Sequence, residues 1–208
     1  GKTAYVISVK LLADKEAITD FGDGRVEITL EIPNTLLGRE LVAVYIGEKD
    51  RIERFDGKII TKKSADKNGK ETETKYYSFE TDHFSVYALA EKSKVDEYEK
   101  TQKNQKLISG VKKTTVKLSS TASKKKIKLS WKKSKGYKVD AYEVYRKTSK
   151  SGKYTKVFTT KKPVSLSWTN SKKLKSGKTY YYKVRGVRTV DGNKYYTKWS
   201  NITSKKIK

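Results

Sequence analysis

Short segments in which apolar and polar residues alternate recur along the whole chain. Residues 26–32 read Val-Glu-Ile-Thr-Leu-Glu-Ile, with an apolar residue at every second position. Successive side chains of a β-strand point to opposite faces, so this pattern predicts a strand with one buried face. Pro33 ends it, because proline cannot donate to the ladder. The same reasoning predicts strands at 41–46, 51–55, 58–62, 75–80 and 84–90, with a polar hairpin tip at 64–70.

The second half of the chain repeats this pattern. Ile127, Leu129 and Trp131 are predicted to face one way, and the residues between them the other. Hairpin turns with positive φ are expected at Ser151-Gly152 and at Asp191-Gly192-Asn193. Further strands are predicted at 114–118, around Tyr142 and Val144, and around Tyr180, Tyr182 and Val184. The fold class is therefore predicted to be all-β, with two tandem antiparallel β-sandwiches.

The distribution of charge also divides the chain into two halves. Residues 1–95 hold 16 of the 49 basic residues and 17 of the 23 acidic ones, a net charge of −1. Residues 96–208 hold the other 33 basic and 6 acidic residues, a net charge of +27. Two modules of different surface chemistry are therefore expected: one at 1–92, a linker at 93–107 and the second at 108–208. The linker is polar and lacks Gly and Pro, which is compatible with an extended segment or with a short exposed helix.

Composition excludes several classes of function. The chain has no Cys, so disulfides, Cys–Zn sites and thiol nucleophiles are excluded. No apolar run approaches the length of a membrane span, about 20 residues. The first residues also lack the continuous apolar segment of a secretory signal. Because it begins with Gly1 and contains no Met, we expect it to be a fragment or mature segment of a longer protein.

The second module resembles a fibronectin type III domain. The resemblance rests on Trp131 at the end of an early strand, on Tyr-Glu-Val-Tyr at 142–145 and on the Leu-x-x-Gly-x-x-Tyr spacing that begins at Leu174. It implies that the hydroxyl of Tyr180 fixes the crossover between the two sheets and that Leu174 packs against its ring. It also implies structural roles for Trp131, Tyr142 and Tyr182. In its high content of Lys and Tyr, this module is similar to fibronectin type III domains of clostridial surface and secreted proteins.

The end of the first module resembles immunoglobulin-like β-sandwich modules that precede such domains. That resemblance rests on Thr-Asp-His-Phe-Ser-Val-Tyr-Ala-Leu-Ala at 81–90. Both resemblances imply an extracellular, multi-module region of a Gram-positive bacterial protein without a catalytic role.

The basic surface of the second module is the main candidate for ligand contact. Of the 49 basic residues only 7 are Arg, and the Lys residues lie on nearly every predicted strand and turn. Lys is a hydrated point charge, whereas Arg predominates where bases are read by paired hydrogen bonds. We therefore expect contact with a cell-wall polyanion or an acidic glycan and no specific nucleic acid. The candidate ligand-binding residues are Arg185, Tyr195, Tyr196, Lys198 and Trp199.

The single histidine and the acidic turns are weaker candidates for chemistry. His83 has no second His or Cys to share a metal, and its expected role is a hydrogen bond at a strand start. Asp20, Asp23 and Asp66 could indicate a calcium site in the first module. However, Asp is also common in turns, where its side chain hydrogen-bonds to the nearby backbone. We predict no catalytic residue, no metal and no cofactor.

The sequence thus predicts a non-catalytic spacer or adhesion region of a secreted or wall-associated bacterial protein. It is expected to be a monomer outside the cell whose partners include the other domains of the same protein. The alternative is a pair of carbohydrate-binding accessory modules of a secreted hydrolase.

Overall fold

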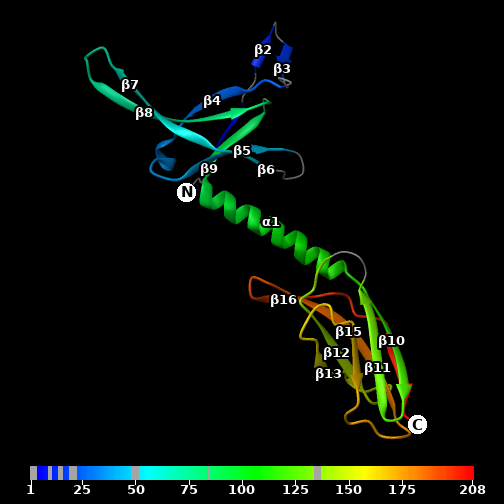
Figure 1. Cartoon of the computed structure of the whole chain (residues 1–208). Helices are drawn as coiled ribbons and strands as arrows, with labels where there is room; N and C mark the ends of the chain where they lie inside the picture. Colours follow the sequence, from blue (N-terminus) through cyan, green and yellow to red (C-terminus); the bar gives the residue numbers. More distant parts are fainter. Residues whose placement is uncertain are drawn as a thin grey trace. The chain divides into compact units, whose positions relative to one another are not determined.

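The computed structural model describes residues 4–8, 11–13, 16–18, 23–47, 52–83, 85–133 and 137–208. The chain divides into two compact units, residues 1–100 and 101–208. Each unit is built from antiparallel sheets, and one helix contributes residues to both (Figure 1).

The first unit contains two main sheets. One has the strand order β1 (Ala4–Ser8), β9 (Val86–Glu91), β5 (Leu41–Ile46) and β6 (Ile52–Phe55). The other has the order β4 (Val26–Glu31), β8 (Glu71–Thr81) and β7 (Gly57–Ala65). A short hairpin of β2 (Leu11–Ala13) and β3 (Glu16–Ile18) and a 3₁₀ turn, η1 (Asn34–Leu36), complete the described part of this unit.

The core of the first unit lies between these two sheets. Ile28 and Leu30 of β4 are buried on the same side, as the alternation at 26–32 predicts. They meet aromatic rings from the other strands, and the rings of Phe79 and Tyr87 lie 5.3 Å apart in an edge-to-face arrangement. Aromatic pairs of this kind add to the free energy of burial. The remaining core residues are Ile32, Leu36, Leu41, Ala43, Tyr77 and Leu89.

The hairpin of β7 and β8 is longer than the sequence pattern predicts. Its register runs from Gly57↔Phe79 to Ala65↔Glu71, and its far half is exposed on both faces. Asp66 closes the tip, because its Oδ1 accepts the backbone N–H groups of Asn68 and Lys70, each at 2.9 Å. Gly69 supplies the positive φ of +75° that this turn requires.

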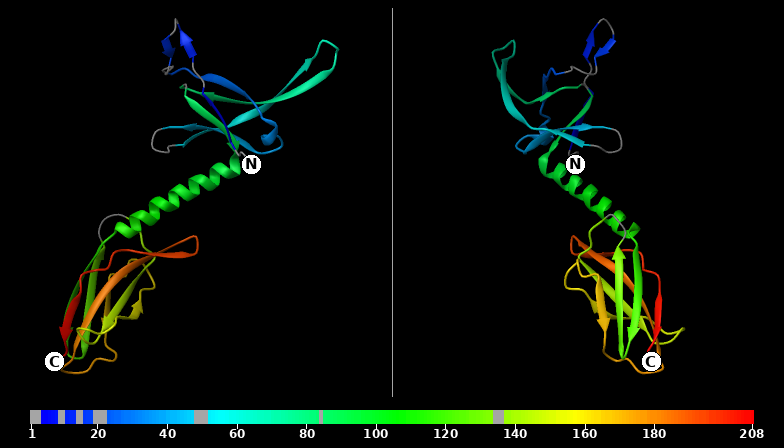
Figure 2. Two further views of the ribbon diagram at one scale, coloured as in Figure 1. Left: turned by 180° about the vertical axis from the view of Figure 1, so that it is seen from behind. Right: turned by 45° about the vertical axis from the view of Figure 1, so that its right-hand side comes forward.

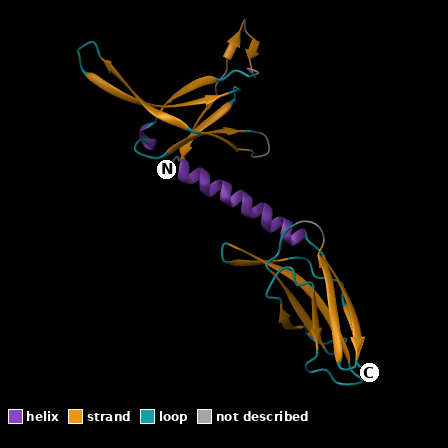
Figure 3. Cartoon of the chain, viewed as in Figure 1, coloured by secondary structure: helices purple, strands orange, loops and turns teal. Residues whose placement is uncertain are grey.

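Residues 92–113 form one α-helix, α1 (Lys92–Lys113), which Figure 3 shows as the long helix of the chain. The predicted linker is therefore helical and not extended. The helix continues six residues into the range predicted for the second module. Its start belongs to the first unit: Val95 covers Val42, Val44, Ala88 and Ala90, and Arg54 donates to Asp96 at 2.7 Å. It ends at Lys113, and the hydroxyl of the next residue, Thr114, donates to the carbonyl of Gly110 at 2.8 Å.

The second unit also contains two sheets, which are visible from two further directions in Figure 2. The smaller sheet has the order β10 (Val116–Ser123), β11 (Lys126–Lys133) and β14 (Ser167–Asn170). The larger has the order β13 (Thr155–Thr159), β12 (Ala141–Lys147), β15 (Thr179–Val190) and β16 (Asn193–Tyr196). A further strand, β17 (Thr203–Lys206), pairs with β15.

The core of the second unit is formed by the inward faces of both sheets. Ile127, Leu129 and Trp131 of β11 are buried, as the alternation predicts. The ring of Trp131 lies 5.6 Å from that of Tyr142 on the opposite sheet. Core residues from β10, the loop before β12, β12 itself, β15 and the C-terminal end are Val116, Leu118, Val139, Val144, Tyr180, Tyr182, Val184 and Ile207.

The predicted all-β class is confirmed by these antiparallel sheets, with α1 as an addition to it. One turn prediction is wrong in detail. Asp191 and Gly192 have φ of +46° and +76°, but Gly152 is not among the glycines with positive φ. Its turn is closed by the N–H of Gly152, which donates to the carbonyl of Ser149 at 3.3 Å. Among the described residues, neither helix combines the length and the apolarity that a membrane span requires.

Candidate polyanion-binding face

The outward face of the larger sheet in the second unit carries alternating cationic and aromatic side chains. β12 and β15 pair in the register Glu143↔Arg185, Tyr145↔Lys183 and Lys147↔Tyr181. The residues between these positions, such as Val144 and Val184, point into the core, so period 2 sends all six side chains outward. We call this set, with Tyr154, Lys156, Tyr196 and Trp199, the cation–aromatic face.

Arg185 is at the centre of this face. Its guanidinium carbon lies 3.5 Å from the ring centre of Tyr196 and 4.6 Å from that of Trp199. Its Nη2 also donates to the hydroxyl of Tyr145 at 3.1 Å. A guanidinium held over two rings and a hydroxyl loses most of its rotational freedom, so it is fixed before any ligand arrives.

Glu143 is the one acidic member of the cation–aromatic face, and its side chain is only 5% exposed. Its carboxylate is 2.9 Å from Nη2 of Arg185 and 3.1 Å from Nζ of Lys156. Burial alone would raise the pKa of Glu143, but the hydrogen bonds from Lys156 and Arg185 outweigh burial and lower it. The carboxylate therefore stays charged and fixes both cations in place.

Lys183 is held between two aromatic rings. Its Nζ lies 3.8 Å from the ring centre of Trp199 and 4.5 Å from that of Tyr154. Desolvation lowers the pKa of Lys183, and the neighbouring charges of Arg185 and Lys147 lower it further. The three cations thus repel one another, and an anion bound beside them would relieve that repulsion.

The structure brings together three of the five predicted ligand-binding residues. Arg185, Tyr196 and Trp199 share the cation–aromatic face. Tyr195 is the neighbour of Tyr196 along β16, so it has the opposite orientation, and its ring centre lies 5.9 Å from Nζ of Lys112 on α1. Lys198 is exposed, and its backbone N–H donates to the carbonyl of Thr114 at 3.0 Å.

Several members of the face are not among the five predicted ligand-binding residues. Tyr181 and Lys183 lie four and two residues before Arg185, so the strand period alone would have placed them on the same face. Tyr145 and Glu143 could not be found in this way, because their position depends on the pairing of β12 with β15. The other missed members are Lys147, Tyr154 and Lys156.

The predicted structural residues lie in and around the core of the second unit. Trp131, Tyr142, Tyr180 and Tyr182 are buried, and Leu174 packs against them from its edge. The hydroxyl of Tyr180 accepts the backbone N–H of Lys175 at 2.8 Å, which closes the turn before β15. The hydroxyl of Tyr182 accepts a hydrogen bond from Nδ2 of Asn170 at 2.8 Å.

His83 lies in the connection between β8 and β9 of the first unit and contacts several neighbours there. Its Nδ1 is 2.8 Å from Oδ1 of Asp82, and this hydrogen bond lowers the pKa of Asp82. Its ring lies 4.9 Å from that of Tyr45, edge to face. Its backbone carbonyl accepts hydrogen bonds from Thr81 and Tyr87.

The described part of the chain contains no cluster of side chains that could form the calcium site considered above. Within that part, no group of three or more His, Asp or Glu side chains is arranged to hold a metal. The Oδ1 of Asp66 already accepts two backbone hydrogen bonds at the tip of the β7–β8 hairpin. Asp20 lies outside the described residues.

No family model and no curated protein sequence matches the chain. Among solved structures, it is similar to pectate lyase PelI from Erwinia chrysanthemi in complex with tetragalacturonic acid, at 20% identity and a TM-score of 0.36. That match covers 43% of this chain and 28% of the lyase chain. A second PelI structure gives 20% identity, a TM-score of 0.35, and 43% and 27% coverage. The chain thus spans little more than a quarter of those proteins, and a likeness of this size carries no functional argument.

Proposed function

We propose that this chain is a non-catalytic spacer and adhesion region of a larger secreted or wall-associated bacterial protein. In this proposal an immunoglobulin-like sandwich precedes a fibronectin type III sandwich, and the second contacts anionic polymers outside the cell. The hydrogen bond from the Lys175 N–H to the Tyr180 hydroxyl supports the second family assignment, because it fixes the turn that the resemblance implies.

The observation that carries the polyanion contact is the excess of positive charge on a surface that is already organised. Residues 96–208 carry a net charge of +27, and four of its cations are fixed on the cation–aromatic face beside a single carboxylate. A polymer that neutralises several such charges releases its counterions, so binding of this kind is steeply salt-dependent.

The test is titration of the full chain with dextran sulfate at rising salt. We expect binding at 50 mM NaCl and a loss of affinity of about 10³-fold by 200 mM, the scale for six to ten charge contacts. Uncharged dextran is the control and should not bind. A chain that fails to bind dextran sulfate at 50 mM NaCl overturns the proposal.

Three further measurements address the other parts of the proposal. Sedimentation velocity is expected to give a monomer, and a dimer would contradict that expectation. A defined DNA duplex should bind only at low salt, and nanomolar affinity that persists at 150 mM NaCl would instead support nucleic-acid recognition. A hydrolytic activity of the purified chain that disappears in His83→Ala would overturn the non-catalytic assignment.

The second candidate function is a carbohydrate-binding accessory module of a secreted hydrolase. One observation favours it: Trp199 is 39% exposed, and its ring lies 5.0 Å from that of Tyr145 at an interplanar angle of 87°. An exposed ring fixed by a second one offers an apolar surface to the C–H groups of a sugar. A neutral-glycan array signal that disappears in Trp199→Ala would favour this function over the first.

A further inference from the structure

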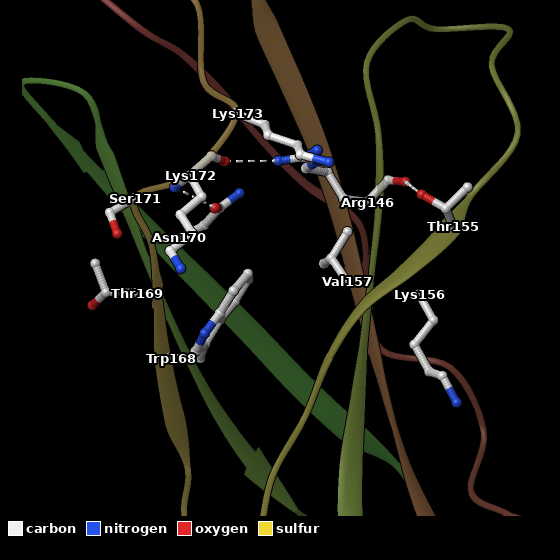
Figure 4. A pocket seen from close by; sticks show the side chains of 10 residues that line it. All are labelled: Arg146, Thr155, Lys156, Val157, Trp168, Thr169, Asn170, Ser171, Lys172 and Lys173. Atoms are coloured by element: carbon white, nitrogen blue, oxygen red, sulfur yellow. Dashed lines mark hydrogen bonds between the residues drawn. The ribbon is translucent and has the colours of Figure 1, made fainter.

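A second cationic region lies at one side of the sandwich in the second unit. A groove of about 570 Å³ runs between β13, the edge of the larger sheet, and β14, the edge of the smaller one. Figure 4 shows its lining, with Trp168 extending from β14 into the space between the two strands. Neither edge has a further strand paired to it in the described part of the chain.

The groove is lined by four cations. They are Arg146, Lys156, Lys172 and Lys173, and none of the ten described lining residues is acidic. Lys156 shares its charge with Glu143 at 3.1 Å, which leaves the other three as the main positive groups. Like charges gathered along a hollow raise the local concentration of anions.

The loop after β14 is fixed by hydrogen bonds. The side chain of Asn170 donates to Tyr182 at 2.8 Å and accepts the backbone N–H of Lys172 at 3.2 Å. Arg146 donates to the carbonyl of Lys172 at 3.4 Å, and its guanidinium carbon lies 5.4 Å from the ring centre of Tyr180. Lys173 has a φ of +56°, so the backbone turns at this residue. The guanidinium of Arg146 and the backbone that carries Lys172 and Lys173 are therefore held at one end of the groove.

The groove also contains a fixed aromatic ring. Trp168 stacks on Phe158, with ring centres 4.9 Å apart and an interplanar angle of 7°. Both rings pack against the core, so the indole is held rigid while it lines the groove. Binding sites commonly combine such an apolar wall with a few placed polar groups.

We propose that this groove binds a segment of an acidic polysaccharide. Carboxylate or sulfate groups pair with Lys172, Lys173 and Arg146, and the C–H face of one sugar ring lies on Trp168. This inference rests on the proposed polyanion contact and names the site and ligand class for it. A saccharide contacts both the charges and the indole wall, whereas a polymer of phosphate alone offers no apolar face to the indole.

The test uses a hexasaccharide of alternating glucuronic acid and N-acetylglucosamine, titrated calorimetrically into the full chain at 100 mM NaCl. The variant Lys172→Glu/Lys173→Glu reverses two charges of the groove. The matched control is Lys124→Glu/Lys125→Glu in the turn between β10 and β11. Both pairs are exposed, and Lys125, like Lys173, has a positive φ, of +52°.

We expect the groove variant to lose at least tenfold in affinity and the matched control to lose less than threefold. Trp168→Leu should also lose about tenfold, with near-native circular dichroism as the check on folding. The carboxyl-reduced hexasaccharide should bind at least tenfold more weakly than the acidic one.

Other outcomes separate this inference from the proposed function. Equal losses in the two double variants, or binding of dextran sulfate without binding of the hexasaccharide, would overturn the groove and leave the polyanion contact standing. Binding of neither probe at 50 mM NaCl would overturn both. Tripolyphosphate or single-stranded DNA that binds as tightly as the hexasaccharide, without dependence on Trp168, would overturn the saccharide assignment.

Discussion

Arg185 and Glu143 lie opposite each other on paired strands, with Nη2 2.9 Å from Oε2, and the carboxylate side chain is 5% exposed. The ion pair lies beneath the cation–aromatic face, whose other charged side chains are all cationic. Removing one partner leaves a charge in a poorly solvated position, which is the most costly way to disturb an ion pair.

The first prediction concerns the cost of breaking this pair. Arg185→Met should lower the free energy of unfolding of the second unit by about 3 kcal/mol, because Glu143 then keeps Lys156 as its one cationic partner, beside the Tyr145 hydroxyl that donates to it at 3.2 Å. All three tryptophans lie in residues 101–208, so tryptophan fluorescence in urea follows this unit alone. In a double-mutant cycle with Glu143→Gln the two losses should not add. Additive losses would show that the pair has no coupling.

The second prediction concerns acid stability. The pKa of Glu143 is lowered in the folded state, so the unfolded chain binds the proton more tightly. The stabilisation by this carboxylate is therefore present above its unfolded pKa and is lost as the pH falls through its folded pKa.

Glu143→Gln should accordingly lower stability at pH 7 and make the curve flatter on its acid side, measured as the urea midpoint from pH 7 to pH 3. The control is Glu71→Gln, at the exposed start of β8 in the other unit. A variant curve parallel to that of the wild type would contradict the assignment.

The third prediction concerns the hydroxyl of Tyr180. Tyr180→Phe removes the acceptor of the Lys175 N–H and keeps the ring in the core, so it should cost about 1–2 kcal/mol. Tyr181→Phe is the matched control on the next residue of β15, and it should change stability by less than about 0.5 kcal/mol. Equal effects of the two variants would show that the turn does not depend on this hydrogen bond.

The fourth prediction concerns Gly110 near the end of α1. A Cβ at this position would overlap the ring of Tyr137, so Gly110→Ala should destabilise the second unit by about 1–3 kcal/mol. In a Tyr137→Ala background the same change should stabilise the helix by about 0.5–1 kcal/mol, since alanine is the better helix former. A stabilising Gly110→Ala in the wild type would disprove the close approach.

The strands were predicted well where one face is buried and the other is solvated. Residues 41–46 form β5 with the predicted bounds, and residues 26–31 form β4 one residue shorter than expected. The β7–β8 hairpin was underestimated, because its far half is exposed on both faces and so carries no hydrophobic alternation. The helix was left open for a similar reason, since few of its 22 residues are apolar.

The candidate site was less predictable than the strands. Alternation identifies residues that share a face of one strand, such as Lys183 and Arg185, but the partner strand has to be known before Glu143 joins them. The groove depends on two edge strands from different sheets, and nothing local to β13 or β14 indicates that they lie beside the same hollow. Sequence patterns report the local period, whereas these sites are made by long-range pairing.

Near its start the helix α1 packs Val95 against Val42 and Val44 of β5 and Ala88 and Ala90 of β9 in the first unit, and near its end Val111 is fully buried. An isolated helix with so few apolar residues pays an unfavourable nucleation free energy that its own propensity does not recover. Each unit buries one apolar residue near one end of α1, so melting of either unit should fray α1 from that side. Loss of helical ellipticity should therefore accompany both melting transitions rather than form a third of its own.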